Sequence, residues 1–490
     1  MTNNLEVKVA AAARWSTFAE VLGKLIAPIS TMVLARVLTP DAFGVIATIN
    51  MIIAFAEIFA DAGFQRYIIQ NEFYDEQDLD KSTNVAFWTN LIISLMIWFV
   101  IALFADELST FVGSPGLGKV LLIACVSIPL TAFSSIQTAV LKRTLDFKSL
   151  FYRRLVSVFV PIFITIPLAL YLKSYWALVI GTICVNLANA IVLMIKSPWR
   201  PSLYYNWKRL KDMWSFTMWS MLDSLLIWAT NYIEIFIIGK YLSPYYLGLY
   251  KTSITTVGQF TSVITASFLP ILLPALSRLQ NDHRAMCDML MRIQKVVGLV
   301  LMPIGFGIYA FKELVTSVLL GSQWNEAVHF IGIWALMETI TILFSRFCSN
   351  VFPALGKPRI SVIIQILHLA FLIPAVLIST KYGFSALFYT RSLVRLQLVF
   401  LNVIFAYSVI KLKFSQLFKN IFPSLIASVV MLLVANCLLM ISSSIFASLL
   451  WIVVSGIVYF SIVLCFKAEK SIILELLKKN IYPKLSKWKR

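Results

Sequence analysis

Long apolar segments separated by short polar ones follow one another along the whole chain. A helix needs about 20 mostly apolar residues to cross the hydrocarbon core of a bilayer, and segments of that length recur from end to end. The pattern therefore predicts an all-α polytopic membrane protein with about fourteen transmembrane helices. The predicted spans are 16–38, 44–62, 84–104, 119–141, 152–172, 175–195, 214–239, 247–274, 292–311, 327–349, 360–380, 384–409, 421–441 and 445–466.

One frame of polar and apolar positions occurs twice, at Arg36–Gly44 and at Lys240–Gly248. Both copies contain, in order, a cation, any residue, Leu, a hydroxyl residue, Pro, two further residues, a bulky apolar residue and Gly. A Trp-Ser pair precedes both copies, at Trp15 and at Trp219. This repetition predicts two lobes that are built on one plan.

The repeat equates the first predicted span with the seventh, so each lobe contains six spans. We expect an N-lobe at 1–205, a C-lobe at 206–415, and a C-terminal region at 416–490 that holds the last two spans and a basic cytoplasmic tail. Because six is an even number, both lobes begin on the same side of the membrane. This predicts a pseudo-two-fold axis along the membrane normal and a central cavity between the lobes.

Loops carry most of the charge of the chain. There are 42 Lys and Arg residues against 23 Asp and Glu residues, a formal net charge of +19. Of the basic residues, 31 lie in segments on the predicted side of the N-terminus, and only seven lie on the other side. The positive-inside rule then places both termini in the cytoplasm. Basic residues spread between apolar spans meet lipid headgroups, so no nucleic-acid partner is expected.

The sequence lacks the motifs of enzymes and metal sites. Its six cysteines form no CxxC pair, and its three histidines (His283, His329 and His368) have no ligand spacing. The stretch Gly113–Lys119 matches most of a phosphate-binding P-loop, but Val120 stands where Ser or Thr would bind Mg²⁺. We therefore expect no catalytic residue, no metal and no nucleotide site, and we do not expect the chain itself to drive pumping with ATP.

Five short stretches carry a family resemblance: Leu34–Gly44, Asp61–Gln70, Leu141–Lys148, Leu320–Trp324 and Ala354–Pro358. They closely resemble the polysaccharide-transporter family of bacterial inner-membrane flippases. This family belongs to the multidrug/oligosaccharidyl-lipid/polysaccharide (MOP) flippase superfamily. The resemblance covers essentially the whole chain and agrees with the fourteen predicted spans.

The resemblance implies a flippase in the bacterial inner membrane. Its substrate would be an undecaprenyl-pyrophosphate-linked oligosaccharide repeat unit, which would move from the cytoplasmic to the periplasmic leaflet by alternating access. The product would feed the assembly of exopolysaccharide or lipopolysaccharide, such as O-antigen or a colanic-acid-like polymer. Expected partners are this lipid-linked substrate, membrane lipids, and the polysaccharide polymerase and chain-length machinery. No cofactor is implied beyond a coupling H⁺ or Na⁺.

Two alternatives remain open. The chain could be a multidrug or peptidoglycan-precursor exporter of the same superfamily. From a different class, it could be a membrane glycan polymerase or ligase. Such an enzyme would be expected to carry a large periplasmic loop with functional Arg or His residues, whereas every predicted outside loop here is short.

Apart from the basic residues at span ends, four lie inside predicted spans: Lys24, Arg346, Arg391 and Arg395. An ionisable side chain at the bilayer centre costs about 2.5–3.5 kcal/mol on insertion scales, so such residues usually face a bundle interior or water. Arg391 and Arg395 lie one helical turn apart with no acidic residue in their span, and two guanidinium groups suit a diphosphate. We expect Lys24, Arg391 and Arg395 to line the cavity and bind the pyrophosphate. Arg346 is a further candidate for this role, but for it we favour a pair with Glu338, two turns earlier.

Acidic residues within the predicted spans are candidates for a coupling-ion site or for ion pairs. Glu20 lies one turn before Lys24, so the two could form an internal ion pair. Asp223 and Glu234 are about three turns apart and share one face of the seventh span. Glu57, in the second span, is a further candidate. Each of these carboxylates could equally pair with a basic residue of another span.

Overall fold

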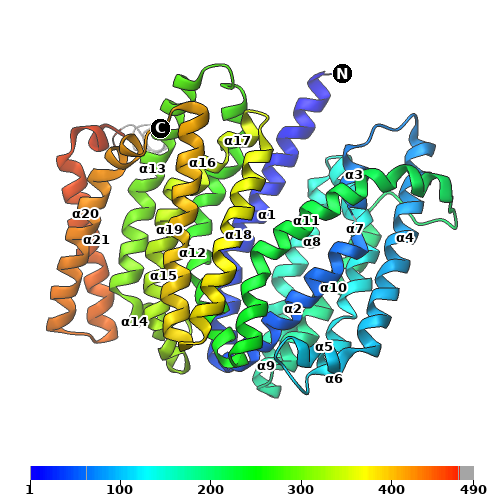
Figure 1. Ribbon diagram of the computed structural model, residues 1–490, viewed down its shortest axis with the longest axis horizontal. Coiled ribbons are helices and arrows are strands. Elements are labelled where there is room, and N and C mark those ends of the chain that lie inside the picture. Colours follow the sequence, from blue (N-terminus) through cyan, green and yellow to red (C-terminus); the bar gives the residue numbers. More distant parts are fainter. Residues whose placement is uncertain (1, 62, 473, 475–490) are drawn as a thin grey trace, which may run out of the picture. The chain divides into compact units, whose positions relative to one another are not determined.

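The computed structural model describes residues 2–61, 63–472 and 474, and within them the side chains of most of 2–21 and of a few positions in 215–223 and 267–271 are not described. Every regular element in the described part is helical, which confirms the predicted all-α class (Figure 1). Contacts divide the chain into two compact units, 1–252 and 253–490. The predicted lobe boundary at 205/206 stays a prediction.

Unit 1 begins with a long helix and contains, within its described residues, six helical segments that are long and apolar enough to cross a membrane. Its elements are α1 (Thr2–Val37), α2 (Pro40–Asp61), α3 (Phe64–Gln70), α4 (Glu76–Leu103), α5 (Ala105–Phe111), α6 (Gly118–Ala124), α7 (Ser127–Arg143), α8 (Phe147–Val160), η1 (Pro161–Thr165), α9 (Ile166–Leu172), α10 (Trp176–Lys196), α11 (Trp207–Tyr241) and the start of α12 (Pro244–Ser277).

Unit 2 contains the rest of α12 and ends in a helical hairpin. Its further elements are α13 (His283–Ala310), α14 (Lys312–Leu319), η2 (Ser322–Ala327), α15 (Val328–Ile340), η3 (Thr341–Arg346), α16 (Phe347–Ser349), α17 (Val351–Ala354), α18 (Pro358–Thr380), α19 (Gly383–Ile410), α20 (Phe414–Ile441) and α21 (Ile445–Cys465). Figure 1 shows α20 and α21 side by side at one edge of this unit.

Twelve helical segments of the described chain are long and apolar enough to cross a membrane. They coincide with twelve of the fourteen predicted spans. The other two predictions, 16–38 and 247–274, fall on α1 and α12, which are helical but whose side chains are described only in part. The structure therefore supports a multi-pass membrane protein, and the count of fourteen stays a prediction.

The duplicated frames meet each other at the N-termini of α2 and α12, within unit 1. A Cβ atom added to Gly44 would lie 1.8 Å from the carbonyl oxygen of Pro244, and one added to Gly248 would lie 1.8 Å from that of Pro40. Because both distances are far below van der Waals contact, no side chain fits at either glycine. The two copies of the frame thus pack backbone against backbone in a reciprocal arrangement.

Candidate substrate site

Charged side chains from two helical segments of unit 2 meet near the middle of their membrane spans. Glu338 lies in α15, at the middle of the segment Ser322–Ala354, and Arg395 lies near the middle of α19. One carboxylate oxygen of Glu338 accepts a hydrogen bond from Arg346 (Nη2–Oε1, 2.7 Å), and the other forms an ion pair with Arg395. The predicted alternative for Arg346, a pair with Glu338, is therefore what the structure contains.

An indole ring holds the two arginines of α19. The guanidinium carbon of Arg395 lies 4.2 Å from the centre of the Trp334 ring, and that of Arg391 lies 5.2 Å from it. Trp334 is 3% exposed and Arg391 is 8% exposed. Cation–π contacts of this kind are strongest where water is excluded. We call Trp334, Glu338, Arg346, Arg391 and Arg395 the Glu338 cluster.

A π-turn, η3, lies between Glu338 and Arg346. Residues eight apart in an uninterrupted α-helix lie about 80° apart around the axis, because 3.6 residues complete a turn. A π-turn, with its i→i+5 hydrogen bonds, winds more slowly and reduces that offset. The turn therefore brings the Arg346 side chain onto the face of Glu338. Thr341, the first residue of η3, accepts a further hydrogen bond from Arg395 (Nε–Oγ1, 3.3 Å).

The exposure of the cluster differs from one member to the next. The side chains of Glu338 and Arg395 are 7% and 11% exposed, whereas that of Arg346 is 43% exposed. The five residues that define the cluster include three guanidinium groups and one carboxylate, so their summed formal charge is positive. Arg346 can present part of that charge to a ligand while Glu338 holds its position. A planar guanidinium is well suited to bind phosphate oxygens in pairs.

A second group of cations lies in unit 1, where α8 packs against α1. The guanidinium of Arg154 lies over Gly23, next to Lys24 in sequence, and a Cβ atom at Gly23 would be 2.6 Å from its Nη2. The Nε of Arg154 is buried and makes no hydrogen bond within the described residues. Arg153 and Lys142 are close enough to interact electrostatically. We call this group the α8 cations: it consists of Arg153 and Arg154 in α8, with Lys142 from the end of the neighbouring α7.

The charge count grouped Lys142, Arg153 and Arg154 with the cytoplasmic segments, although Arg153 and Arg154 lie at the start of the predicted span 152–172. The structure places both deeper within a helix, because α8 begins at Phe147, five residues before the predicted span. The capping residue Asp146, which accepts hydrogen bonds from the Ser149 backbone N–H and hydroxyl, was the available signal for this earlier start.

Other basic residues of unit 1 have structural roles. Arg143 donates hydrogen bonds to the carbonyl oxygens of Ile68 and Asn71, both at 2.8 Å, and so fixes the end of α3 against α7. Arg209 of α11 forms an ion pair with Asp78 of α4, and this pair raises the pKa of the Arg209 guanidinium further above its ordinary value. These two cations are engaged by the protein itself.

The predicted acidic candidates fall in different surroundings. Glu234 is buried and accepts a hydrogen bond from the Tyr250 hydroxyl (2.5 Å), which favours a structural role. Glu57 is bonded by the Thr131 side chain and lies close to Asp61 on α2. Glu20 is exposed on α1. The side chain of Asp223 lies outside the described residues.

The structure brings three of the predicted cavity cations together, Arg346, Arg391 and Arg395, all in unit 2. The carboxylate that pairs with Arg395, Glu338, comes from another span, which the absence of acids within the Arg391–Arg395 span could not reveal. Lys24 lies in unit 1 and is partly exposed; it follows Gly23, over which the Arg154 guanidinium lies. Glu57 and Glu234 lie on α2 and α11, which pack together in unit 1 through contacts such as the hydrogen bond from Trp228 Nε1 to the Met51 carbonyl (3.1 Å).

Comparison with known sequences gives consistent matches. A family model described as "Polysaccharide biosynthesis protein" matches residues 33–329. The succinoglycan biosynthesis transport protein ExoT of Rhizobium meliloti is 25% identical over 65% of this chain and 64% of its own length. The lipopolysaccharide biosynthesis protein WzxC of Escherichia coli is 21% identical over 66% of each chain. The chain thus aligns with slightly less than two thirds of the length of each of these relatives.

Comparison with solved structures identifies the fold. An inward-facing multidrug resistance MATE family transporter of the MOP superfamily superposes with a TM-score of 0.58 at 13% sequence identity. The match covers 81% of this chain and 96% of that transporter. At this identity the likeness shows the fold alone, which is that of a MOP-superfamily transporter.

Proposed function

Because the chain belongs to the polysaccharide biosynthesis protein family, we propose that it is a flippase for an undecaprenyl-pyrophosphate-linked oligosaccharide repeat unit. The substrate passes from the cytoplasmic to the periplasmic leaflet of a bacterial inner membrane by alternating access. Both termini lie in the cytoplasm, and the product supplies the assembly of an exopolysaccharide or lipopolysaccharide. The names of the relatives, which concern succinoglycan and lipopolysaccharide, support this class of cargo.

The observation that carries this proposal is the gathering of three arginines near the middle of their spans, with the Arg346 side chain 43% exposed. A cation in the hydrocarbon region is costly. An anionic substrate group would stabilise arginines gathered at this depth. In this proposal Arg346 binds pyrophosphate oxygens, while Arg391 and Arg395, held on Trp334, add to the positive potential.

Unit 1 contributes cations of its own in this proposal. Lys24 and the α8 cations form a second region that attracts the pyrophosphate, and the buried Nε of Arg154 is a donor that a phosphate oxygen satisfies. Glu57 and Asp61, neighbouring carboxylates on α2, are the best-placed pair for a coupling H⁺ or Na⁺. The remaining candidates for the coupling-ion site, which rank lower, are Glu20, Asp223 and Glu234.

The alternative functions differ in whether their substrates would benefit from the positive charge of the Glu338 cluster. An exporter of cationic drugs gains nothing from a net-positive cluster, because like charges repel in a low-dielectric site. The substrate of a peptidoglycan-precursor exporter also contains a pyrophosphate, so only its glycan distinguishes it from the substrate proposed here. A glycan polymerase or ligase would instead produce a glycan whose length differs from that of its substrate.

Deletion of the gene tests these functions against one another. The proposed flippase predicts that an undecaprenyl-pyrophosphate-linked repeat unit of a surface polysaccharide accumulates at its full repeat length. Complementation with Arg346→Ala should leave surface polysaccharide reduced at least about tenfold, as expected for loss of a charge-assisted contact, whereas Arg359→Ala, an exposed arginine at the start of α18, should restore it. Accumulation of a peptidoglycan precursor, or of polymerised glycan on the cytoplasmic side, would contradict the proposal.

A further inference from the structure

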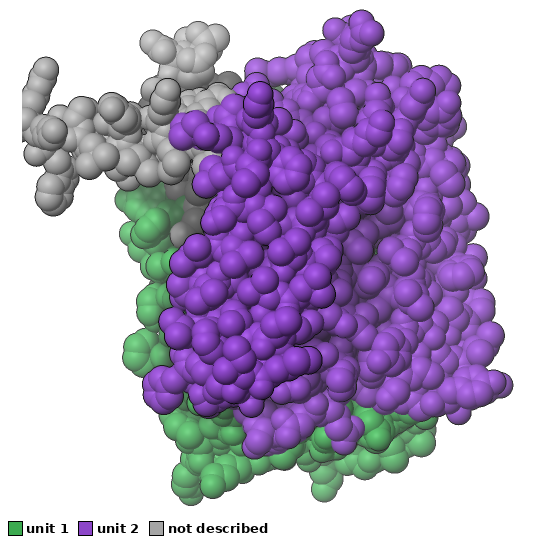
Figure 2. Space-filling view, turned by 90° about the vertical axis from the view of Figure 1, so that its left-hand side faces the viewer, with its two compact units in different colours: residues 1–252 green, residues 253–490 purple. Residues whose placement is uncertain are grey.

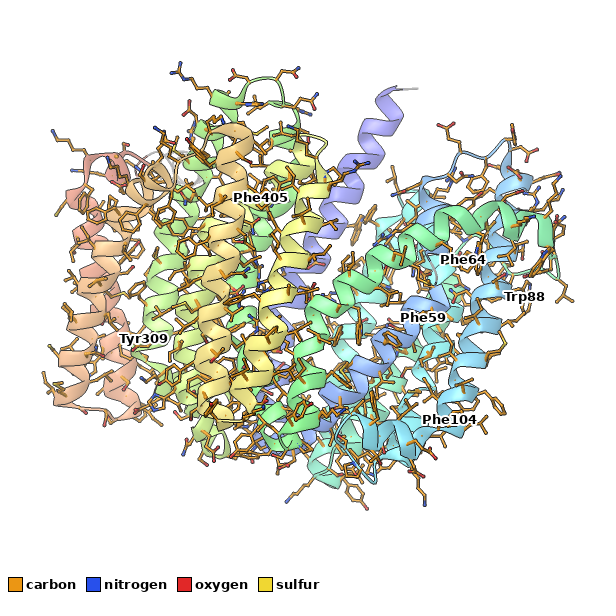
Figure 3. The ribbon with its side chains drawn as sticks, in the orientation of Figure 1. Phe59, Phe64, Trp88, Phe104, Tyr309 and Phe405 are labelled. Atoms are coloured by element: carbon orange, nitrogen blue, oxygen red, sulfur yellow. The ribbon has the colours of Figure 1, made fainter. Side chains whose placement is uncertain are left out.

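A second polar region of unit 2 surrounds a cavity that is separate from the Glu338 cluster. The cavity has a volume of about 900 Å³ and lies between the end of α13, α14, η2, the start of α15 and the α20–α21 hairpin. The hairpin turn, 442–444, joins the ends of two membrane spans, so this end of the cavity lies at a membrane–water interface. Figure 3 labels Tyr309, one of its lining residues, at the end of α13 beside the hairpin.

The cavity is lined by two opposite charges that do not neutralise each other. Lys312 and Glu313, the first residues of α14, both face it. Neither forms an ion pair within the described part of the chain. The ammonium of Lys312 lies 5.1 Å from the centre of the Tyr309 ring, which fixes the cation without supplying a counter-charge. The cavity therefore offers one cationic and one anionic partner to a ligand.

An amide group in the hairpin provides an independent sign of a polar ligand. Asn436 lines the cavity and stands five residues before the end of α20, about 7.5 Å along the helix axis. Its side chain forms no hydrogen bond with the described residues, in a helix that is otherwise strongly apolar. An amide at this depth is costly unless it bonds to water or to a ligand. Asn325 and His329 add polar groups on the opposite wall.

The hairpin side of the cavity is apolar and continuous with a lipid-facing surface. Met440 and Ile445, which line it, are 87% and 54% exposed. Phe446, next to Ile445, is 86% exposed. Figure 2 looks onto the face of unit 2 to which the hairpin belongs. A ligand in this cavity therefore meets polar groups on one side and hydrocarbon on the other.

We propose that this cavity binds a zwitterionic phospholipid whose headgroup is a phosphodiester carrying a primary ammonium. The phosphate contacts Lys312 and the amide of Asn436, the ammonium contacts Glu313, and an acyl chain lies along Met440 and Ile445. An anionic lipid without an ammonium would pair its phosphate with Lys312 but leave Glu313 without a counter-charge, and a neutral sugar would offer a charge to neither Lys312 nor Glu313. The inference does not depend on the proposed transport function.

Native mass spectrometry of the full-length protein, released from nanodiscs with equal amounts of phosphatidylethanolamine, phosphatidylglycerol and phosphatidylcholine, tests this site. We expect preferential retention of phosphatidylethanolamine. Phosphatidylcholine should be retained at least about tenfold less, because its methylated ammonium cannot donate the hydrogen bond to Glu313. This comparison uses the unaltered protein. Preference for phosphatidylglycerol, or equal retention of phosphatidylethanolamine and phosphatidylcholine, would overturn the proposal.

Matched variants locate the binding to this cavity. Lys312→Met and Glu313→Gln should each abolish the preference for phosphatidylethanolamine. Lys381→Met and Glu326→Gln, exposed residues of the same unit that do not line the cavity, should retain it. Retained preference in both cavity variants, or equal losses in cavity and control variants, would assign the lipid to another place and overturn the site.

Discussion

At the scale of single residues, Glu338 is the carboxylate that pairs with two arginines of unit 2. It is 5% exposed and contacts both Arg346 and Arg395. Removing one member of a buried ion pair leaves the other charge uncompensated and typically costs about 3–5 kcal/mol. The carboxylate is thus required for the arginines to be tolerated in the membrane, while the exposed side of Arg346 stays available for a substrate.

We expect Glu338→Gln to lower the free energy of unfolding by about 3 kcal/mol, because two guanidinium groups lose their counter-charge. The double variant Glu338→Gln with Arg395→Gln should lose less than the sum of the single variants, with a coupling energy of about 0.5–3 kcal/mol. Thermal unfolding of the detergent-purified protein measures both. The control Glu326→Gln, at an exposed residue, should leave the free energy of unfolding unchanged. If the stability losses of Glu338→Gln and Arg395→Gln simply added in the double variant, the ion pair would be contradicted.

Sequence spacing could predict some of these residue contacts and not others. Glu338 and Arg346 are eight residues apart in one span, so their pairing was visible as an option. The contact of Glu338 with Arg395 joins residues 57 positions apart in different helices, and no local pattern encodes it. Arg154 was counted with a cytoplasmic segment, since a count of charges on one side of the membrane does not distinguish a cation beyond a helix from one in its first turns.

At the scale of helices, two local irregularities position the functional groups. The π-turn η3 aligns Arg346 with Glu338, and the duplicated Pro and Gly residues allow the N-termini of α2 and α12 to pack closely. The repeat itself was evident in the sequence, as was the position of most spans, because both follow from apolar length and residue type. The π-turn was not evident in the sequence, because a local change to i→i+5 hydrogen bonds leaves no mark on the order of apolar residues.

The contact between α2 and α12 gives a matched prediction on one helix. Gly248→Ala places a methyl group against the Pro40 carbonyl and should destabilise the protein by about 1–3 kcal/mol. Gly258→Ala, ten residues further along α12, meets nothing within 4 Å and should be neutral or stabilising by up to about 1 kcal/mol. Melting temperatures of the purified variants measure the difference. Equal shifts for the two substitutions would contradict the close packing at Gly248.

At the scale of the whole molecule, the distribution of charge sets the orientation in the membrane. The turn 442–444 between α20 and α21 contains no charge, whereas the segment between α19 and α20 contains Lys411 and Lys413. The positive-inside rule therefore predicts that the first lies in the periplasm and the second in the cytoplasm. The same bias predicts that both chain ends lie in the cytoplasm, where the lipid-linked substrate of the proposed flippase would be made.

Cysteine labelling in intact cells tests this orientation. In a chain whose exposed Cys437 and Cys465 are replaced by Ser, Ser443→Cys should react with a membrane-impermeant maleimide added outside the inner membrane. Lys413→Cys should react only after the membrane is opened. The reverse pattern would invert the assignment and with it the direction of transport.

Transport of the lipid-linked oligosaccharide in proteoliposomes tests the central claim most directly. The measurement follows the fraction of an undecaprenyl-pyrophosphate-linked repeat unit that becomes accessible on the opposite leaflet, with the accumulated substrate of the deletion strain as cargo. We predict movement by the unaltered protein and by Arg359→Ala, partial movement by Arg346→Lys, which keeps the charge but not the fork of donors, and at least about a tenfold loss for Arg346→Ala. Unchanged movement in Arg346→Ala, or none with the unaltered protein, would contradict the account.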